Sequence, residues 1–396
     1  MSSATPKNAG MVAERAGRFY LPELDVLRFF AFFAVFIFHL PEPFALKFFD
    51  QPGLLGTFGR AGAFGVDLFF ALSGYLITGL LLRERERSGD INMPAFYARR
   101  TLRIWPLYYF SIGLAFLLTR LPESITSAPQ FAHPLFLPMK PSAYFFMALF
   151  LFNFNFESSL MTNPLPFMGL LWTISVEEQF YLFWPWVVRY VPRKRIVVIP
   201  ILMIAVACIV RATLTFNLLR LVWSFTFSRL DPIAVGILIA LLPAFNPRPA
   251  LRLLMVMIGI ASWGFAAGWC GLPYQNDTLL ISMGFPAVAL GSGAFVLATI
   301  GASGLRRDTA LLRGLSYLGK ISYGLYVYSA ITYFATAIVV FKLLMPAASV
   351  SVMTFSIYVL LALVFNLGAA AASYRWLETP FLKLKERFTR IPSRTI

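Results

Sequence analysis

The residues of this sequence that could take part in chemistry are charged or polar side chains inside apolar runs. The first such run, residues 24–41, contains Asp25, Arg28 and His39. A charged group at the centre of a membrane helix costs about 3 kcal/mol on the insertion scale, so those that persist tend to be functional. On a helix, Arg28 and His39 are three turns plus about 20° apart, which places them on one face about 16 Å apart along the axis. A histidine there could act as a general base, although a lone helical histidine can also be a packing residue.

Asp67 is the charged residue expected at the depth of His39 on a neighbouring helix. It lies near the start of the second apolar run, residues 64–82. Its carboxylate could orient or charge-balance the imidazole of His39. Alternatively, Asp67 interacts only with the dipole at the start of its own helix. Ser73 and Gly74, further along the run, could simply allow two helices to pack closely.

Arg100 and Arg103 directly precede the third apolar run, residues 104–119. Being three residues apart, they face the same side of a helix. Guanidinium groups bind phosphates through paired hydrogen bonds, so a phosphorylated cofactor could be held at this expected cytoplasmic boundary. Arginines at such boundaries can instead set membrane orientation or contact anionic lipids.

Glu177 and Glu178 are adjacent carboxylates in the fourth apolar run, residues 168–189. Near the middle of a membrane they lack water to solvate them, so packing alone does not explain them. Adjacent residues differ by about 100° around a helix, so we expect one carboxylate to face the interior and the other an arginine or an outer cavity. Asp231 is expected to form an internal ion pair with Arg229.

Composition indicates that these runs are transmembrane helices. Of 396 residues, 59% are apolar and 13% are charged, and the mean hydropathy is +0.72. Soluble domains carry roughly 25% charged residues, and about 20 apolar residues cross a bilayer as a helix. We therefore predict an all-α, polytopic helical bundle. The ten expected spans are residues 24–41, 64–82, 104–119, 168–189, 196–216, 223–243, 252–269, 279–300, 318–341 and 351–373.

The positive charges predict how the bundle is oriented. The segment 83–103 holds six arginines, so we expect it in the cytoplasm. A further apolar run at 143–156 is short; if it lies in the outer interface, every later basic cluster also falls in the cytoplasm. We therefore predict ten spans with both termini cytoplasmic, and eleven spans is the alternative. The membrane domain would be residues 21–378, between cytoplasmic tails at 1–20 and 379–396.

Several other functions are disfavoured. The formal net charge is +16, but the arginines flank apolar runs, so we do not expect nucleic-acid binding. The sequence has no Gly-x-Ser-x-Gly elbow, no phosphate-binding glycine loop and no histidine or cysteine cluster for a metal. Both serine-nucleophile hydrolysis and metal catalysis are therefore disfavoured. His133, in an expected outer loop, is assigned no chemical role.

Taken in order, these motifs resemble those of the acyltransferase-3 family of bacterial membrane O-acyltransferases. The motifs are Arg28 with His39, Gly65–Ile77, Arg100 with Arg103, Trp172–Tyr181, Tyr317–Tyr326 and Glu378–Pro380. Each motif alone is weak, but the ordered set is specific and covers nearly the whole chain. Many members of this family carry an extra extracytoplasmic hydrolase-like domain. Here the apolar spans run almost to the last residue, so acceptor transfer is expected to use this domain alone or a separate partner.

The resemblance implies an acyl-coenzyme A donor, acetyl-CoA or another acyl-CoA, and a hydroxyl-bearing acceptor such as a sugar, glycolipid or macrolide. It implies that His39 is the essential histidine, with Arg28 as its partner on the same helix, Arg100 and Arg103 at the donor, and Glu177 in the fourth span. From the residues themselves we also expect Arg28 to bind the donor, and Glu177 or Asp67 to hold the imidazole. No metal is implied. The residues expected to contact the acceptor are Trp172, Glu178, Tyr75 and Ser73.

The resulting hypothesis is a multi-pass enzyme of the bacterial cytoplasmic (inner) membrane, surrounded by membrane lipid. The donor's phosphates bind at the inner face, and its acyl arm reaches between helices to His39. This residue either deprotonates the acceptor hydroxyl or carries the acyl group transiently. A proton-coupled secondary transporter is the alternative, because intramembrane acids and a histidine could form a proton relay. No internal repeat supports the transporter, and a non-catalytic scaffold would not need polar residues at matched depths.

Overall fold

The regular elements of the described chain are helices, as the apolar runs predicted. The computed structural model describes residues 21–40, 53–122, 124, 140–154, 167–214, 219–243, 245–269, 280–302, 309–344 and 351–389. Within these ranges no strand occurs. The expected N-terminal tail, the end of the expected C-terminal tail and His133 lie outside the described residues.

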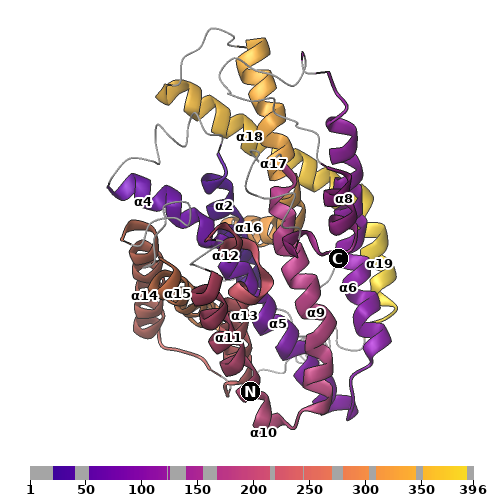
Figure 1. The fold of residues 1–396 in the computed structure, drawn as a ribbon, viewed down its shortest axis with the longest axis vertical. Helices are drawn as coiled ribbons and strands as arrows, with labels where there is room; N and C mark the ends of the chain where they lie inside the picture. Colours follow the sequence, from indigo (N-terminus) through magenta and orange to yellow (C-terminus); the bar gives the residue numbers. More distant parts are fainter. Residues whose placement is uncertain are drawn as a thin grey trace, which may run out of the picture.

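The helices follow one another along the chain and form an elongated bundle (Figure 1). They are α2 (Pro22–Phe38), α4 (Leu54–Ala61), α5 (Gly65–Ser88), α6 (Met93–Leu118), α8 (Pro141–Ala148), α9 (Trp172–Tyr190), α10 (Arg193–Ile196), α11 (Val198–Leu214), α12 (Leu219–Ser224), α13 (Leu230–Leu241), α14 (Pro249–Gly268), α15 (Phe285–Thr299), α16 (Ala310–Lys320), α17 (Ser322–Ile338), α18 (Val352–Ser373) and α19 (Thr379–Glu386). Short 3-10 or π-helical turns adjoin them: η1 (Gly62–Phe64), η2 (Phe152–Phe154), η3 (Phe167–Leu171), η4 (Thr226–Arg229), η5 (Leu280–Gly284), η7 (Val339–Leu344) and η8 (Tyr374–Glu378).

The helix lengths support a membrane protein with several spans. By length and composition, seven helical stretches of the described chain could cross a membrane: Leu54–Ser88, Met93–Leu118, Arg193–Leu214, Pro249–Gly268, Ile281–Thr299, Ser322–Leu344 and Val352–Glu386. Three further expected spans, at 24–41, 168–189 and 223–243, fall on α2, α9 and the pair α12 and α13. The short run at 143–156 overlaps α8, which has eight residues. Such a helix is about 12 Å long, well short of the ~30 Å hydrocarbon layer.

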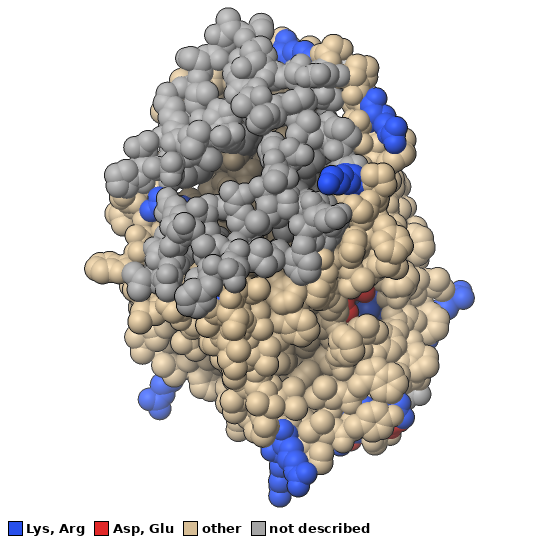
Figure 2. Space-filling view, viewed as in Figure 1, with Lys and Arg blue, Asp and Glu red and all other residues tan. Residues whose placement is uncertain are grey.

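The exterior of the bundle is apolar, as expected for a surface in contact with lipid. Large apolar side chains on α11 and α14 point outward, for example Ile209 (63% exposed) and Leu253 (64% exposed). Figure 2 shows one face of the molecule, on which uncharged residues cover most of the described surface. Because exposed apolar area of this extent is unfavourable in water, the bilayer is the natural solvent for these helices.

Helix α6 begins eleven residues earlier than the predicted span at 104–119. Asn92 caps it, because its side-chain oxygen accepts a hydrogen bond from the backbone N–H of Ala95 at 3.0 Å. A proline in the first turn also favours a helix start at this point. Arg100 and Arg103, expected just outside the membrane helix, therefore lie within it.

Helices α5 and α13 pack with their backbones in contact, which fixes the position of α5. A Cβ atom on Gly74 would lie 2.2 Å from the carbonyl oxygen of Ile233, and one on Gly236 would lie 2.0 Å from that of Ala71. Only glycine permits so close an approach, a common device between membrane helices. The contact holds the face of α5 that carries Ser73 toward α9.

The C-terminal helix α19 lies beside α6 (Figure 1). Leu382 in this helix is buried, and Arg99 of α6 donates a hydrogen bond from Nη1 to the carbonyl oxygen of Phe388 at 2.7 Å. Part of the segment predicted as a free tail, residues 379–396, is thus packed on the bundle.

Candidate active site

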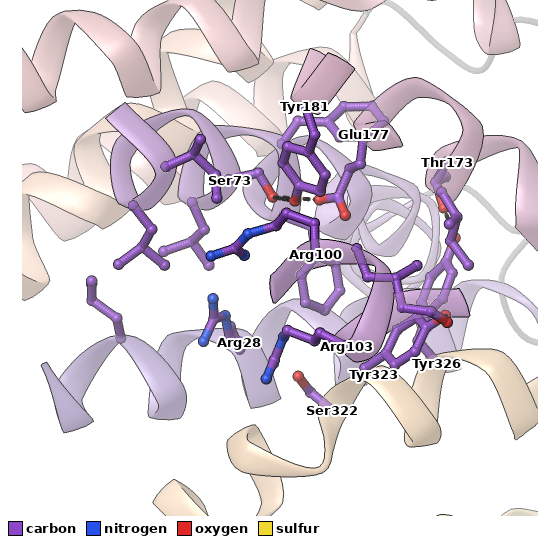
Figure 3. Close-up of a pocket in the computed structure, with 18 of the residues that line it drawn as sticks. Arg28, Ser73, Arg100, Arg103, Thr173, Glu177, Tyr181, Ser322, Tyr323 and Tyr326 are labelled. Carbon is purple, nitrogen blue, oxygen red and sulfur yellow. Dashed lines mark hydrogen bonds between the residues drawn. The ribbon is translucent and has the colours of Figure 1, made fainter. Parts of the chain in front are cut away.

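A cavity that is partly open to the outside lies between α2, α5, α6, α9 and α17. Figure 3 shows its polar side chains around one space. The polar lining residues are Asp25, Arg28, Ser73, Arg100, Arg103, Thr173, Glu177, Tyr181, Ser322, Tyr323, Tyr326 and Lys385. The rest of the wall is mostly aliphatic and phenylalanine side chains.

Three guanidinium groups gather on one side of this cavity, those of Arg28, Arg100 and Arg103 (Figure 3). Arg28 donates from Nη1 to Oδ1 of Asp25 at 3.1 Å. Arg100 lies 5.8 Å from the ring centre of Tyr181, and its buried Nε has no hydrogen-bond partner in the structure. Like charges held together repel, and an anion between them relieves the repulsion. The arrangement therefore suits a ligand with phosphate groups.

Glu177 faces the same cavity, and the hydroxyl groups of Ser73 and Tyr181 form a chain that ends on its carboxylate. Ser73 of α5 donates its hydroxyl proton to Oε1 of Glu177. The hydroxyl oxygens of Ser73 and Tyr181 are 3.1 Å apart, so Tyr181 can donate to Ser73 in turn. This chain of hydroxyl groups ties α5 to α9 and holds the carboxylate at the cavity wall.

Glu178 points away from Glu177, as the 100° rotation predicted, but its partner is not an arginine. The indole Nε1 of Trp105 donates to Oε2 of Glu178 at 3.1 Å. The other oxygen, Oε1, is buried without a hydrogen-bond partner in the structure. Glu178 faces α6 and does not belong to the described wall of the cavity. Its predicted contact with the acceptor stays a prediction.

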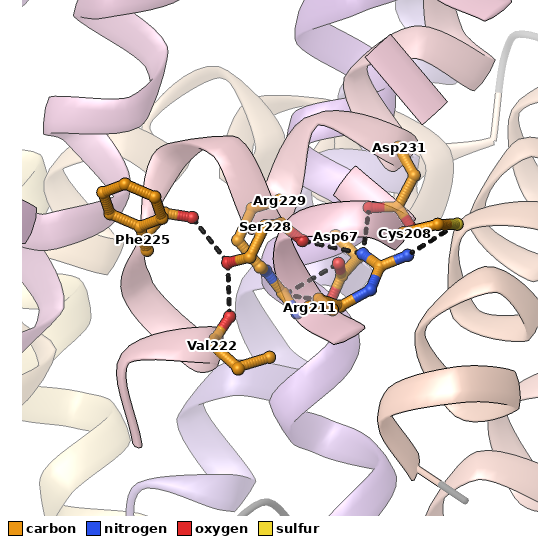
Figure 4. Close-up of polar contacts among 8 residues, drawn as sticks. All are labelled: Asp67, Cys208, Arg211, Val222, Phe225, Ser228, Arg229 and Asp231. Carbon is orange, nitrogen blue, oxygen red and sulfur yellow. Dashed lines mark hydrogen bonds and ion pairs between the residues drawn. The ribbon is translucent and has the colours of Figure 1, made fainter. Parts of the chain in front are cut away.

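Asp67 does not contact the imidazole of His39, in contrast to the prediction that it orients this ring. Both of its carboxylate oxygens accept hydrogen bonds from Nη2 of Arg229, each at 2.7 Å (Figure 4). Asp67 is 1% exposed and Arg229 is fully buried. The pairing predicted for Asp231 is also wrong, because Asp231 accepts from Nη1 of Arg211 at 3.0 Å. A buried carboxylate pairs with the nearest buried cation, and here each finds one on another element.

Trp172 belongs to the surroundings of this buried ion pair. Its ring centre lies 5.9 Å from the guanidinium carbon of Arg229 and 6.0 Å from the ring centre of Phe70. Trp223 and Phe285 lie closer still to Arg229, at 4.8 and 4.6 Å. Aromatic faces stabilise a buried cation, so these rings help to keep Arg229 charged away from water.

His39 follows the last residue of α2 and does not belong to the described wall of the cavity. Its Nδ1 lies 2.9 Å from the carbonyl oxygen of Val35, one turn back in the helix. A carbonyl oxygen can only accept, so Nδ1 carries the proton in the neutral ring and Nε2 keeps its lone pair. Neither Asp67 nor Glu177 holds the ring; the backbone of its own helix sets the tautomer.

On α2 the described cavity wall ends at Arg28, eleven residues and about 16 Å along the helix axis before His39. Val66 of α5 also lines the cavity, and the preceding Gly65 packs against Ala31 and Val35 of α2. Arg28 at the cavity and His39 beyond it thus lie at two levels of one helix.

The structure also places Tyr75, a predicted site residue, and Lys385, for which no role was predicted. Tyr75, predicted to bind the acceptor, lies outside the described cavity wall and packs beside α13 and α15. Lys385, which was assigned to a free tail, lines the cavity instead. Nothing in the local sequence around Lys385 indicates a site, because only the return of α19 to α6 brings it there.

A family model and several known proteins match this chain. A family model described as an acyltransferase domain matches residues 21–381. O-acetyltransferase OatA of Staphylococcus aureus is 27% identical over an alignment of 383 residues, which covers 92% of this chain and 57% of that protein. A putative O-acetyltransferase of the same species is 26% identical over 389 residues, with 92% and 58% covered.

A third relative matches over a shorter stretch. Peptidoglycan O-acetyltransferase OatA of Listeria monocytogenes is 32% identical over 179 residues, covering 43% of this chain and 24% of that protein. The chain therefore spans a little over half the length of the two Staphylococcus relatives and less of the Listeria protein. No solved structure matches the chain at a comparable level.

Proposed function

Because the chain belongs to the acyltransferase family whose domain model matches residues 21–381, we propose that it is a membrane O-acyltransferase. In this proposal it transfers an acetyl group from cytoplasmic acetyl-coenzyme A to a hydroxyl group of an envelope glycan. The observation that carries the proposal is the cluster of Arg28, Arg100 and Arg103 in the wall of a cavity that also contains Glu177. The guanidinium groups suit the phosphates of coenzyme A.

The membrane arrangement in this proposal is ten spans with both termini in the cytoplasm of a bacterial inner membrane. The six arginines between residues 83 and 103 support this orientation, because basic residues concentrate on the cytoplasmic side. In this orientation the three arginines of the cavity lie toward the cytoplasm, where coenzyme A is found. His39, at the other end of α2, lies toward the outer side, where a glycan acceptor is found.

In the proposed chemistry, His39 acts as the general base. Its Nε2 lone pair, left available by the Nδ1 contact with Val35, takes the proton of the acceptor hydroxyl. The hydroxyl oxygen attacks the thioester carbonyl, and a carbon–oxygen bond replaces the carbon–sulfur bond. The leaving thiolate of coenzyme A then takes the proton from His39. The products are an O-acetyl ester and free coenzyme A.

The acceptor class rests on the relatives. The name of the Listeria relative gives peptidoglycan as the molecule that it acetylates. For this chain we propose the broader class of sugar hydroxyl groups in the cell envelope. Glycolipid and macrolide hydroxyl groups are chemically equivalent at the point of attack.

The proposal is tested with purified protein in lipid nanodiscs, radiolabelled acetyl-coenzyme A and isolated envelope glycan. General-base catalysis contributes about 10²–10⁴ in rate, so His39→Ala should lower acetyl transfer by at least about 100-fold. Donor binding, measured separately, should persist in His39→Ala and be lost in Arg100→Ala combined with Arg103→Ala. The matched control is His133→Ala, which changes the chain's other histidine and should leave transfer unchanged.

Two results would contradict the proposal. Wild-type transfer by His39→Ala would show that this imidazole is not the base. Wild-type protein that binds no coenzyme A, but moves a solute in exchange for protons, would favour the transporter alternative. Neither result depends on knowing the natural acceptor, because hydrolysis of the bound thioester can also be followed.

A further inference from the structure

A second, much smaller cavity adjoins the first beside α19. Leu80, Arg100, Arg103 and Lys385 line both cavities, so the two share a wall. Phe96 adds an aromatic surface to the smaller cavity. A ligand in the larger cavity can therefore contact the positively charged residues of the shared wall.

The position of α19 over this wall is fixed by hydrogen bonds. Arg99 donates from Nη1 to the carbonyl oxygen of Phe388 at 2.7 Å, and from Nη2 to Oε2 of Glu84 at 3.0 Å. The other oxygen of Glu84 accepts from the backbone N–H of Asn92 at 3.0 Å. The Glu84 side chain is 4% exposed, so this network is largely shielded from water. It ties the end of α19 to the turn between α5 and α6 and so holds Lys385 in place.

The shared wall is strongly positive. Glu84 is the one acidic residue among the described residues that line the smaller cavity, and it is paired with Arg99. Arg100, Arg103 and Lys385 add three positive charges where the cavities meet. Clefts lined by one sign of charge concentrate ligands of the opposite sign, which here means a polyanion.

Resting on the proposed function, we propose that Lys385 binds the 3′-phosphate of coenzyme A at the wall that the two cavities share. The acyl arm enters the larger cavity toward Glu177, and Arg100 with Arg103 takes the diphosphate. The adenosine end and its 3′-phosphate are then left at the shared wall, beside Lys385 and Phe96. A phosphate monoester carries about two negative charges at neutral pH, which an ammonium group binds well.

The test compares coenzyme A with dephospho-coenzyme A, which lacks only the 3′-phosphate. Dissociation constants of both are measured for the full chain and for Lys385→Gln in detergent micelles without added lipid. One charged hydrogen bond changes affinity by about 10-fold to 100-fold. The wild type should therefore prefer coenzyme A by about that factor, and Lys385→Gln should lose the preference. The matched control is Lys383→Gln, an exposed lysine two residues away that lines neither cavity.

The ratio of the two affinities is measured within each variant, so partial unfolding of a variant changes both values equally and leaves the ratio intact. An unchanged preference in Lys385→Gln, with coenzyme A still bound, would overturn this inference alone. Wild-type protein that binds neither compound would overturn the proposed function as well. The measurements are repeated in nanodiscs with and without anionic lipid, because a lipid headgroup also carries a phosphate that a lysine can bind. If Lys385→Gln changes only lipid binding, the inference is wrong.

Discussion

The buried pair of Asp67 and Arg229 allows a sharp test of whether Asp67 is structural or catalytic. Because Asp67 was expected at the membrane depth of His39, it was predicted to orient the imidazole. Its observed partner, Arg229, indicates instead that it stabilises the fold. The substitution Asp67→Asn preserves the shape of the side chain and removes its charge. It leaves the guanidinium group of Arg229 buried with no opposing charge from this residue.

The expected loss of stability follows from the environment of the pair. Asp67 and Arg229 are both almost completely buried, and Nε and Nη1 of Arg229 already have no hydrogen-bond partner in the structure. Breaking a buried ion pair by removing one partner costs about 3–5 kcal/mol. Asparagine keeps one oxygen that can accept from Arg229, and the aromatic rings around the guanidinium group remain. We therefore expect a loss in the free energy of unfolding at the lower end of this range, about 3 kcal/mol.

The free energy of unfolding is measured by titrating mixed detergent micelles with dodecyl sulfate, for the wild type, Asp67→Asn and the double variant Asp67→Asn with Arg229→Met. The double variant removes the unpaired charge and should recover part of the lost stability. Acetyl transfer, expressed per folded molecule, should stay near the wild-type rate in Asp67→Asn. His39→Ala should show the opposite behaviour, with stability retained and transfer lost.

The reasoning would be refuted by one combination of results. If Asp67→Asn unfolds with the wild-type free energy, binds coenzyme A normally and yet fails to transfer the acetyl group, Asp67 acts in the chemistry. The observed ion pair would then be one of two arrangements of this residue, and the original prediction for the imidazole would hold.

Two further predictions concern the helix contact and the carboxylate of the cavity. Gly74→Ala and Gly236→Ala each place a Cβ against a backbone carbonyl, so they should destabilise the bundle by about 1–3 kcal/mol or more; Gly113→Ala, with open space around it, should be neutral or stabilising by up to about 1 kcal/mol. The same unfolding titration compares them. Ser73→Ala removes the hydroxyl that binds Glu177 and should lower single-turnover transfer about tenfold, whereas Ser73→Thr should keep most of it. Equal rates for the two Ser73 variants would show that this residue only packs.

Local spacing was enough to predict features that lie within one helix. The run lengths predicted helices, the three-residue spacing of Arg100 and Arg103 placed both on the cavity side, and the 100° rotation separated Glu177 from Glu178. These predictions succeed because helix geometry relates sequence distance directly to direction in space.

Features that depend on contacts between distant segments could not be predicted in this way. Arg229 reaches Asp67 from 162 positions further along the chain, and no pattern in either segment indicates the pairing. The error for Asp231 had a local cause: residues two apart point in different directions on a helix, so Arg229 was a poor candidate from the start. The start of the third helix was predicted too late, at residue 104, because the arginines between 99 and 103 were taken as the membrane boundary. Asn92 caps the helix, which begins eleven residues earlier.

Helix α2 sets the distance over which the proposed reaction must work, because Arg28, proposed to bind the donor, lies near one end and His39, the proposed base, follows the other. The helix is held by close backbone contacts at both ends. A Cβ on Gly319 would lie 1.7 Å from the carbonyl oxygen of Asp25, and one on Gly62 would lie 2.3 Å from that of Ala34. Such contacts leave no room for α2 to slide along its neighbours. The separation of about 16 Å between Arg28 and His39 along the axis is therefore fixed by the fold. A donor anchored at the arginines reaches the imidazole only through a long flexible arm, which coenzyme A has and a simple acyl phosphate lacks.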